Sequence, residues 1–239
     1  MLTVKNLIKH FGNKKAVNGV SFTIEQGEIF SLIGPNSSGK TTIVKSIVGL
    51  LQPTEGTVII GDFDIVKNPI EAKQLMGYIP DEPSLWPYMT GEEFLYFTQA
   101  LYGMDEKTRL ASLPSLLEPL HLAGLEKDYF EEYSRGNKQK FSITAAMSHK
   151  PQLLLIDEPI VGLDPTGAEI AKKMFVDFAK KGGAVLLVTH TLPVAEEISD
   201  RIGFLKDGTL IAVGTIAELR QKAGLESKAT LEDIYKKLA

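Results

Sequence analysis

The sequence contains no cysteine among its 239 residues. This absence excludes disulfides, cysteine-ligated zinc and catalysis by a thiol, and it fits a reducing compartment. The apolar runs, such as LLLI at 153–156 and AVLLV at 184–188, are far shorter than the ~20 residues of a membrane-spanning helix. The first residues, MLTVKNLIKHF, lack the separate charged and apolar regions of a signal peptide. We therefore expect any membrane part to come from another polypeptide.

The chain also has no excess of basic residues. Its 26 lysines and arginines are outnumbered by 30 aspartates and glutamates, which gives a net charge of -4 at pH 7. Domains that bind nucleic acids usually carry a basic excess or a basic face, so we expect no nucleic-acid partner. Hydrophobic residues make up 44% of the composition, which is typical of a globular protein with a real core.

What the sequence does have is an alternation of strand and helix patterns. Strands are predicted at 2–8, 20–24, 28–34, 57–62, 153–156 and 184–188, with a hairpin of 202–205 and 209–213 near the end. Helices are predicted at 41–51, through most of 91–149 with breaks at Gly103, Pro114 and Gly124, and at 165–181. This order predicts an α/β fold with a mainly parallel sheet, an added antiparallel layer and a helical insertion.

The stretch GPNSSGKTT, residues 34–42, fits the phosphate-loop pattern G-x-x-x-x-G-K-[ST] between a strand and a helix, which is the context that the motif requires. Backbone N–H groups and the helix N-terminus of such a loop surround phosphates, the lysine contacts the β- and γ-phosphates, and the next hydroxyl binds Mg²⁺. The candidate nucleotide-binding residues are Gly34, Pro35, Asn36, Ser37, Ser38, Gly39, Lys40, Thr41 and Thr42, with Lys40 also catalytic and Thr41 also a metal ligand.

An acidic pair, Asp157 and Glu158, follows an apolar strand in LLLIDEP, residues 153–159. Its side chains would emerge at the C-terminal edge of the sheet, where ligands of open α/β sheets bind. We expect Asp157 to hold Mg²⁺ and Glu158 to polarise a water for attack on the γ-phosphate. Alone, the pair could be an acidic turn; beside the phosphate loop, it favours a site for ATP and Mg²⁺.

With these two motifs, the chain resembles the ATP-binding subunit of ABC transporters over nearly its whole length. The other matching features are Phe11 as the aromatic that stacks on adenine, GYIPDEP (77–83) at the Q-loop, YSRGNKQK (133–140) as an altered signature, VGLDP (161–165) as the D-loop, and LLVTH (186–190) ending in the switch histidine His190. The resemblance implies a P-loop NTPase (RecA-like) core with an antiparallel β subdomain and an inserted helical subdomain. One ABC-type domain would cover residues 1–239, with the helical subdomain at about 82–150 and a C-terminal tail at about 224–239.

The resemblance also implies partners. Ser134 and Gly136 would contact the γ-phosphate of a second ATP-binding subunit, and His190 the γ-phosphate of its own nucleotide, so that two chains, alike or different, dimerise head-to-tail around two ATP molecules. The dimer would drive a separate integral membrane permease from the cytoplasmic face, and the motifs resemble those of bacterial exporters. The alternative is a soluble ABC-type ATPase, for example in iron–sulfur cluster assembly; a small P-loop kinase or GTPase fits less well, because it would lack a signature and a D-loop.

Several residues depart from the family pattern. Tyr133, Arg135 and Asn137 replace Leu, Gly and Gln of the common signature. Arg135 could reach a phosphate, an acidic partner or only solvent, and we favour solvent. Asp81 stands where the family usually has Gln, so we expect it near the metal, with a charge that Gln lacks. Since the core set of site residues is complete, we predict an active ATPase.

Overall fold

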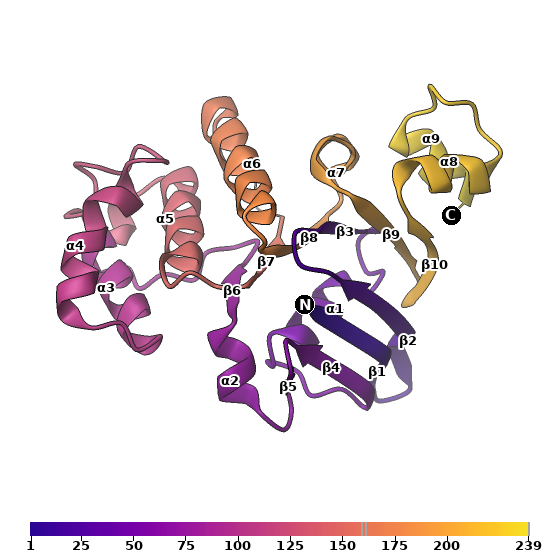
Figure 1. Ribbon diagram of the computed structural model, residues 1–239, viewed down its shortest axis with the longest axis horizontal. Coiled ribbons are helices and arrows are strands. Elements are labelled where there is room, and N and C mark those ends of the chain that lie inside the picture. Colours follow the sequence, from indigo (N-terminus) through magenta and orange to yellow (C-terminus); the bar gives the residue numbers. More distant parts are fainter. Residues whose placement is uncertain (159, 161, 239) are drawn as a thin grey trace.

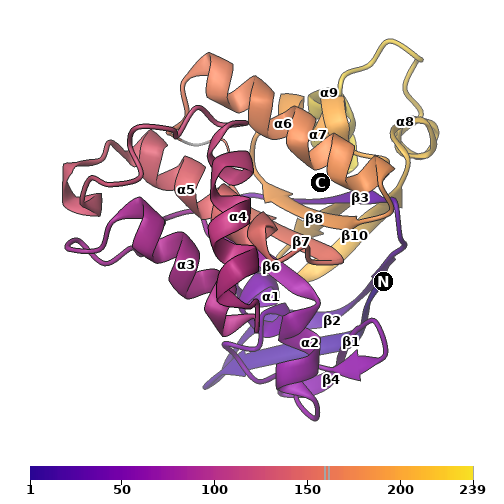
Figure 2. The ribbon, with the colours of Figure 1, turned by 60° about the vertical axis from the view of Figure 1, so that its left-hand side comes forward.

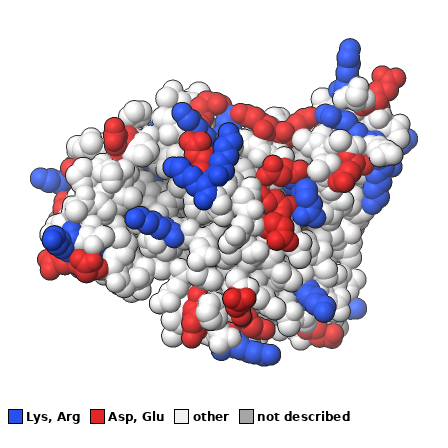
Figure 3. Space-filling model, viewed as in Figure 1, with Lys and Arg blue, Asp and Glu red and all other residues white. Residues whose placement is uncertain are grey.

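The computed structural model describes residues 1–158, 160 and 162–238. Pro159, Val161 at the start of the predicted D-loop and Ala239 in the predicted tail lie outside the described residues. Figure 1 shows two β-sheets in the middle and on one side of the molecule, with helices grouped around them. The space-filling view of the same face shows basic and acidic side chains interspersed (Figure 3), as a nearly balanced composition leads one to expect.

The larger sheet carries six strands in the described part of the chain. In spatial order they are β10 (Thr209–Gly214), β9 (Arg201–Lys206), β3 (Ile29–Ile33), β8 (Ala184–Thr189), β7 (Leu153–Asp157) and β6 (Met76–Ile79). All neighbours pair in parallel except β9 and β10, which form the predicted antiparallel hairpin. Every residue of β3, β7 and β8 is buried, because layers of structure cover both faces of a parallel sheet.

The two faces of this sheet pack against different parts of the chain. In β7, Leu153 and Leu155 join a cluster with the antiparallel sheet and α1 (Lys40–Ile47), whereas Leu154 and Ile156 join a cluster with the helical subdomain and α6 (Pro165–Lys180). This alternation is the period of two that a strand imposes on its side chains. The short apolar run LLLI therefore contributes to two hydrophobic cores at once.

The smaller sheet is antiparallel, in the order β2 (Lys14–Ile24), β1 (Leu2–Phe11), β4 (Glu55–Ile60) and β5 (Phe63–Asp64). β1 and β2 are longer than the strands predicted at 2–8 and 20–24, because polar residues outside the alternating stretches also pair in the ladder. The turn at Gln26 and Gly27 then passes the chain from this sheet to β3 of the larger one. Between β5 and β6 lies α2 (Pro69–Gln74).

The helical insertion consists of α3 (Gly91–Leu101), α4 (Glu106–Leu117), a 3-10 turn (Phe130–Glu132) and α5 (Arg135–Ser148). Figures 1 and 2 both show α3, α4 and α5 gathered on the β6 side of the molecule. The predicted break at Pro114 is wrong, since α4 continues through it. A proline removes one N–H donor and crowds the residue four positions earlier, here Leu110, whose side chain is exposed, so this turn of the helix faces solvent.

Aromatic rings form the centre of the helical subdomain. The buried Phe130 ring makes edge contacts with Phe94, Tyr133 and Phe141, with centroids 5.4, 5.3 and 5.6 Å away. Tyr133 and Phe141 stack on each other. Tyr133 thus occupies the first signature position as a core residue, and α5 begins two positions later. The aromatic cluster thereby fixes where the signature helix starts.

At the other end of the molecule, α7 (Leu192–Ile198), α8 (Ile216–Ala223) and α9 (Leu231–Leu238) pack on β9 and β10 around a third buried cluster. Figure 1 shows α8 and α9 next to the C-terminus, far from α3 and α4. None of the helices in the described ranges combines the length and hydropathy that a membrane span requires.

Replacing Phe130 with alanine should lower the free energy of unfolding of the helical subdomain by about 3–5 kcal/mol, because a buried aromatic side chain leaves a cavity. Urea titration followed by the fluorescence of Trp86, the single tryptophan of the sequence, reports on this subdomain. The matched control is Leu110→Ala, which removes an exposed side chain and should change stability by less than about 1 kcal/mol. Equal losses in the two variants would contradict the central place of Phe130.

Candidate nucleotide site

The site lies at the C-terminal edge of the parallel sheet. In the register of the sheet, Ile33 of β3 pairs with Thr189 of β8, and Asp157 of β7 pairs with Val188 of β8. The residues that follow these positions therefore emerge side by side. A backbone hydrogen bond from Glu158 N–H to the Val188 carbonyl, at 2.9 Å, extends the pairing by one step. The sheet itself thus brings the phosphate loop, the acidic pair and His190 to one edge.

The phosphate loop runs from the end of β3 to α1 and requires glycine at two points. A Cβ on Gly34 would lie 2.4 Å from the Leu205 carbonyl oxygen, and one on Gly39 would lie 2.6 Å from the Ala16 carbonyl oxygen. Gly39 also has φ +109° and caps α1 without a side-chain hydrogen bond. Ser37 takes a left-handed conformation with φ 69°, which costs a serine more than a glycine. Ser37, which stands where the family commonly has a glycine, therefore places strain in the loop.

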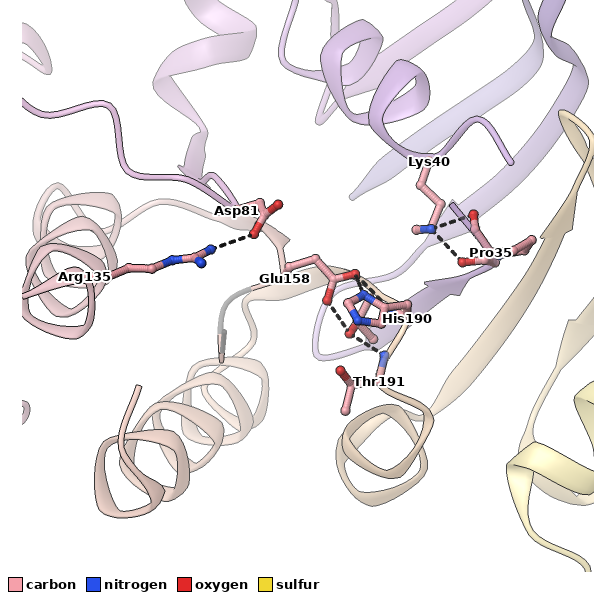
Figure 4. A network of polar contacts seen from close by, with 9 residues as sticks. Pro35, Lys40, Asp81, Arg135, Glu158, His190 and Thr191 are labelled. Atoms are coloured by element: carbon pink, nitrogen blue, oxygen red, sulfur yellow. Dashed lines mark hydrogen bonds and ion pairs between the residues drawn. The ribbon is translucent and has the colours of Figure 1, made fainter. Parts of the chain in front are cut away.

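Two polar groups of the loop are arranged for an anion. Lys40 is buried, and its Nζ donates to the carbonyl oxygens of Gly34 at 2.6 Å and Pro35 at 3.0 Å (Figure 4). Burial lowers the pKa of Lys40, and the nearby negative charges of Glu158 and Asp157 partly offset this lowering. The Ser38 hydroxyl is buried without a hydrogen-bond partner among the described residues. Buried polar groups are nearly always paired, so this hydroxyl lacks a hydrogen bond that a phosphate oxygen reaching into the loop would supply; Ser38 itself does not line the cavity over the sheet edge.

Glu158 is held by three contacts from the end of β8. Its Oε1 accepts from the His190 backbone N–H at 2.8 Å and lies 2.6 Å from His190 Nδ1, and its Oε2 accepts from the Thr189 hydroxyl at 2.8 Å. Figure 4 shows the carboxylate and the His190 ring facing each other. The backbone of Glu158 has φ 50°, an uncommon conformation for a residue with a side chain that is often found at functional sites.

The surroundings of Asp157 raise its pKa, and the positive charge of Lys40 only partly offsets this effect. Burial raises the pKa of Asp157 to about 6, and the charges of Glu158 and Asp81 add to the effect. Burial together with Asp157 and Asp81 also raises the pKa of Tyr78 to about 12. Burial first, and the neighbouring carboxylates second, thus disfavour the ionised form of Asp157 at this edge, and a bound divalent cation would relieve both effects.

A cavity of about 1130 Å³ opens over this edge. The predicted site residues that line it are Phe11, Asn36, Ser37, Gly39, Lys40, Thr41, Thr42, Asp81, Asp157, Glu158 and His190. Seven other charged or aromatic residues that line it were not predicted as nucleotide ligands: Lys14, Lys15, Lys45, Tyr78, Glu82, Arg135 and Asp207. Sequence signals for three of them exist, since Lys14 and Lys15 closely follow Phe11, and Lys45 lies one helical turn after Thr41.

Five of the predicted nucleotide-binding residues do not line this cavity: Gly34, Pro35, Ser38, Ser134 and Gly136. The Ser134 hydroxyl caps its own helix by accepting from the Asn137 N–H at 3.2 Å. A Cβ on Gly136 would lie 2.7 Å from the Gly162 carbonyl oxygen, so the start of α5 packs against the loop that follows the acidic pair. We expected Arg135 to point into solvent, and this expectation is wrong. The Arg135 guanidinium forms an ion pair with the Asp81 carboxylate at 3.5 Å (Figure 4).

The residues present fit Mg²⁺ bound together with a nucleotide rather than alone. No group of three or more histidine, aspartate or glutamate side chains in the described ranges could hold a metal ion. Mg²⁺ typically takes only one or two protein carboxylates and completes its shell with phosphates and water. Thr41 and Asp157, which line the same cavity as Lys40, suit that arrangement.

The fold and this edge together define a P-loop NTPase of the α/β class. Residues 17–161 match the family model described as ABC transporter, and the chain belongs to this family. Its sequence is similar to that of the linearmycin resistance ATP-binding protein LnrL of Bacillus subtilis (strain 168), with 36% identity in an alignment that covers 94% of this chain and 72% of LnrL. It is also similar to the ABC-type transporter ATP-binding protein EcsA of the same strain, with 34% identity in an alignment that covers 100% of this chain and 96% of EcsA.

Solved structures agree with this assignment. A structure described as the ATP-binding subunit of an ABC transporter matches with a TM-score of 0.95 at 33% identity, covering 100% of this chain and 99% of that one. A dimeric ATP-binding cassette in a post-hydrolysis state, bound to ADP and phosphate, matches with a TM-score of 0.83 at 26% identity, covering 90% and 99%. The chain is therefore an ABC ATPase, as the sequence predicted.

Replacing Asp157 with asparagine should stabilise the fold at neutral pH while weakening Mg²⁺-dependent nucleotide binding. Because the pKa of Asp157 is raised to about 6, the folded chain binds its proton more tightly than the unfolded chain. This group should therefore make wild-type stability fall as the pH rises from about 4 to about 6. The variant lacks that contribution and should be more stable at pH 7 by about 1–3 kcal/mol.

Urea unfolding at several pH values between about 4 and 8 measures this difference. Asp62→Asn, which neutralises an exposed carboxylate in the turn after β4, is the control and should leave the pH slope close to that of the wild type. An Asp157→Asn protein with an unchanged slope would show that the site does not disfavour the ionised carboxylate.

Proposed function

We propose that this ABC transporter ATP-binding subunit works as a head-to-tail dimer that hydrolyses ATP between its two chains and drives a separate membrane permease. The observation that carries the proposal is the separation of two phosphate-binding features. Lys40, Asp157 and Glu158 line one cavity, and Arg135 reaches it through its ion pair with Asp81, whereas the flanking Ser134 and Gly136 do not line it. A second chain placed head-to-tail would bring its signature residues to the open side. The dimeric cassette among the similar structures supports this arrangement.

Within each site, we assign the steps of hydrolysis to residues of the sheet edge. Lys40, the phosphate-loop amides and the Ser38 hydroxyl bind the phosphates, and Thr41 with Asp157 would hold Mg²⁺, which supplies charge neutralisation when bound. Glu158 orients and polarises the attacking water. His190 holds Glu158 in place through the contacts described above, and its exposed ring lines the cavity, where a ring protonated on both nitrogens would also donate to the γ-phosphate.

For the base, we assign Phe11 as the stacking surface. Its ring is 49% exposed at the end of β1 and lines the cavity. Lys9 Nζ lies 5.4 Å from the centroid of the ring and donates to the Gln52 carbonyl oxygen at 2.7 Å. The cation therefore steadies the ring without covering both of its faces. Adenine, rather than a base selected by hydrogen bonds, is the ligand we expect there.

We place the permease on the helical subdomain. Trp86 and Tyr88, in the loop before α3, are 53% and 76% exposed, and Phe97 contacts the Trp86 ring edge-on with its own surface partly exposed. An exposed aromatic patch of this kind marks a partner site. The chain would then sit peripherally at the cytoplasmic face of a membrane. Export as the direction of transport fits the resistance function in the name of one relative.

Glu158→Gln should trap an ATP-bound dimer, because the amide keeps the size of the carboxylate but cannot act as a base. Sedimentation velocity with ATP and Mg²⁺ should show a dimer that is absent without nucleotide. The same variant carrying Lys40→Ala should stay monomeric, since it loses the phosphate contact. A Glu158→Gln chain that binds ATP yet remains monomeric would contradict the head-to-tail proposal.

A tagged Glu158→Gln chain, recovered from detergent-solubilised membranes of its native cell with ATP present, should bring down an integral membrane protein in near-equal amount. Adding Trp86→Ala and Tyr88→Ala should lose this protein while keeping the ATP-dependent dimer. Adding Ile70→Ala, which removes an equally exposed apolar side chain from α2, should retain it. Recovery of soluble partners only, with no bait on membranes, would favour the non-transport ATPase instead.

A further inference from the structure

Two residues that depart from the family pattern are in contact with each other. Asp81 lies in the loop after β6, and Arg135 is the first residue of α5. The Arg135 guanidinium lies 3.5 Å from the Asp81 carboxylate, and each side chain is about half exposed. Figure 4 shows the pair on one side of Glu158, with Lys40 on the other side. The common family pattern, with Gln and Gly at these positions, has no such pair.

The backbone around Arg135 aims its side chain toward this loop. A Cβ on Gly162, which has φ +91°, would lie 3.1 Å from the Cγ and Cδ atoms of Arg135, so the arginine runs over a glycine with little room to spare. One helical turn later, the buried Gln139 reaches the same loop, and its Nε2 donates to the Pro80 carbonyl oxygen at 3.4 Å. One face of α5 therefore contacts two consecutive residues of the loop.

The side-chain amide of Gln139 is only partly hydrogen-bonded. Its Oε1 is buried with no partner among the described residues, and its one hydrogen bond is long. A buried amide with an unpaired atom is costly, so this contact stabilises the loop weakly. The charge pair is therefore a second contact, also a weak one, between Asp81 and α5.

The charge of Asp81 acts on the metal site. Asp81, Asp157 and Glu158 line the same cavity, and Asp81 carries a charge where the family has a neutral amide. An unpaired carboxylate here would attract a divalent cation more strongly than an amide does, because Mg²⁺ prefers charged oxygen ligands. A guanidinium held against that carboxylate competes with the cation, both by occupying its oxygen and by adding positive charge.

We propose that Arg135 is a positioning residue for the metal step: it holds Asp81 on α5 and limits the strength with which that carboxylate draws a divalent cation into the nucleotide site. The two departures then compensate each other, since the arginine offsets the charge that the aspartate adds. This inference rests on the nucleotide site of the proposed function and assigns that site a further regulator within the same chain.

A double-mutant cycle with Asp81→Gln and Arg135→Gln tests the proposal. In the Glu158→Gln background with ATP, Mn²⁺ replaces Mg²⁺ as the probe, and electron paramagnetic resonance of free Mn²⁺ gives its dissociation constant. Arg135→Gln should tighten Mn²⁺ binding about twofold to fivefold, the size expected for loss of an exposed ion pair. In the chain that already carries Asp81→Gln, the same change should have no effect.

Two matched variants separate charge from position. Arg135→Lys keeps the charge and should bind Mn²⁺ as the parent does. Lys138→Gln removes a different cation from the same helix, one with no ion pair in the described part of the chain, and should also bind as the parent does. A matching effect of Lys138→Gln would reduce the result to general electrostatics and overturn the assignment.

Equal effects of Arg135→Gln with and without Asp81 would also overturn it, because the arginine would then act on the nucleotide directly rather than through the aspartate. No effect in either background would overturn it as well. Failure of the parent chain to bind ATP with Mn²⁺ at all would refute the proposed function itself. An ATP-binding parent with an additive cycle would refute only the role of Arg135.

Discussion

The parallel register of β3, β8 and β7 is the constraint on which the rest of the molecule depends. Each strand is wholly buried and ends at the same edge of the sheet. The chain leaves that edge as a glycine-dependent loop after β3, as an acidic pair after β7 and as a histidine after β8. Because these strands also separate two hydrophobic cores, their position is fixed from both faces. The positions of the site residues are therefore fixed by the packing of buried strands.

This placement has an energetic cost that explains the chemistry of the site. A lysine and two carboxylates lie largely out of water at the sheet edge, where charged groups are disfavoured unless they are paired. Lys40 uses loop carbonyls, and Glu158 uses donors at the end of β8. Among the described residues, Asp157 has no comparable hydrogen-bond partner, and burial together with the neighbouring carboxylates raises its pKa. The site is poised to gain stability from a cation and an anion that arrive together, which is what a nucleotide with its metal provides.

The sequence predicted those parts of the structure that depend on local spacing. The phosphate loop, the buried strands and the hairpin at β9 and β10 were recognisable because neighbouring residues determine them. The ion pair of Asp81 with Arg135 was not, since it joins distant segments whose approach is decided by how α5 packs on β6. The prediction at Pro114 failed for a similar reason: local propensity favours a break, while the exposed face of α4 tolerates a missing donor. Residue roles that depend on a second chain stay predictions.

The N-terminus of α5 joins the hydrophobic core of the helical subdomain to the nucleotide site. Tyr133 anchors it in the aromatic core, Ser134 caps it, and Arg135 reaches across to the loop after β6. A rotation of the helical subdomain must therefore either carry this loop along or break the ion pair. An exposed ion pair is weak enough to break at little cost. Because this pair lines the cavity, the charge of a nucleotide and its metal would decide whether the pair breaks or the loop moves with the subdomain. The altered signature is thus more than a tolerated variant: it gives α5, the helix that the proposed dimer would turn toward a partner chain, a direct electrostatic contact with Asp81 on the edge of its own cavity.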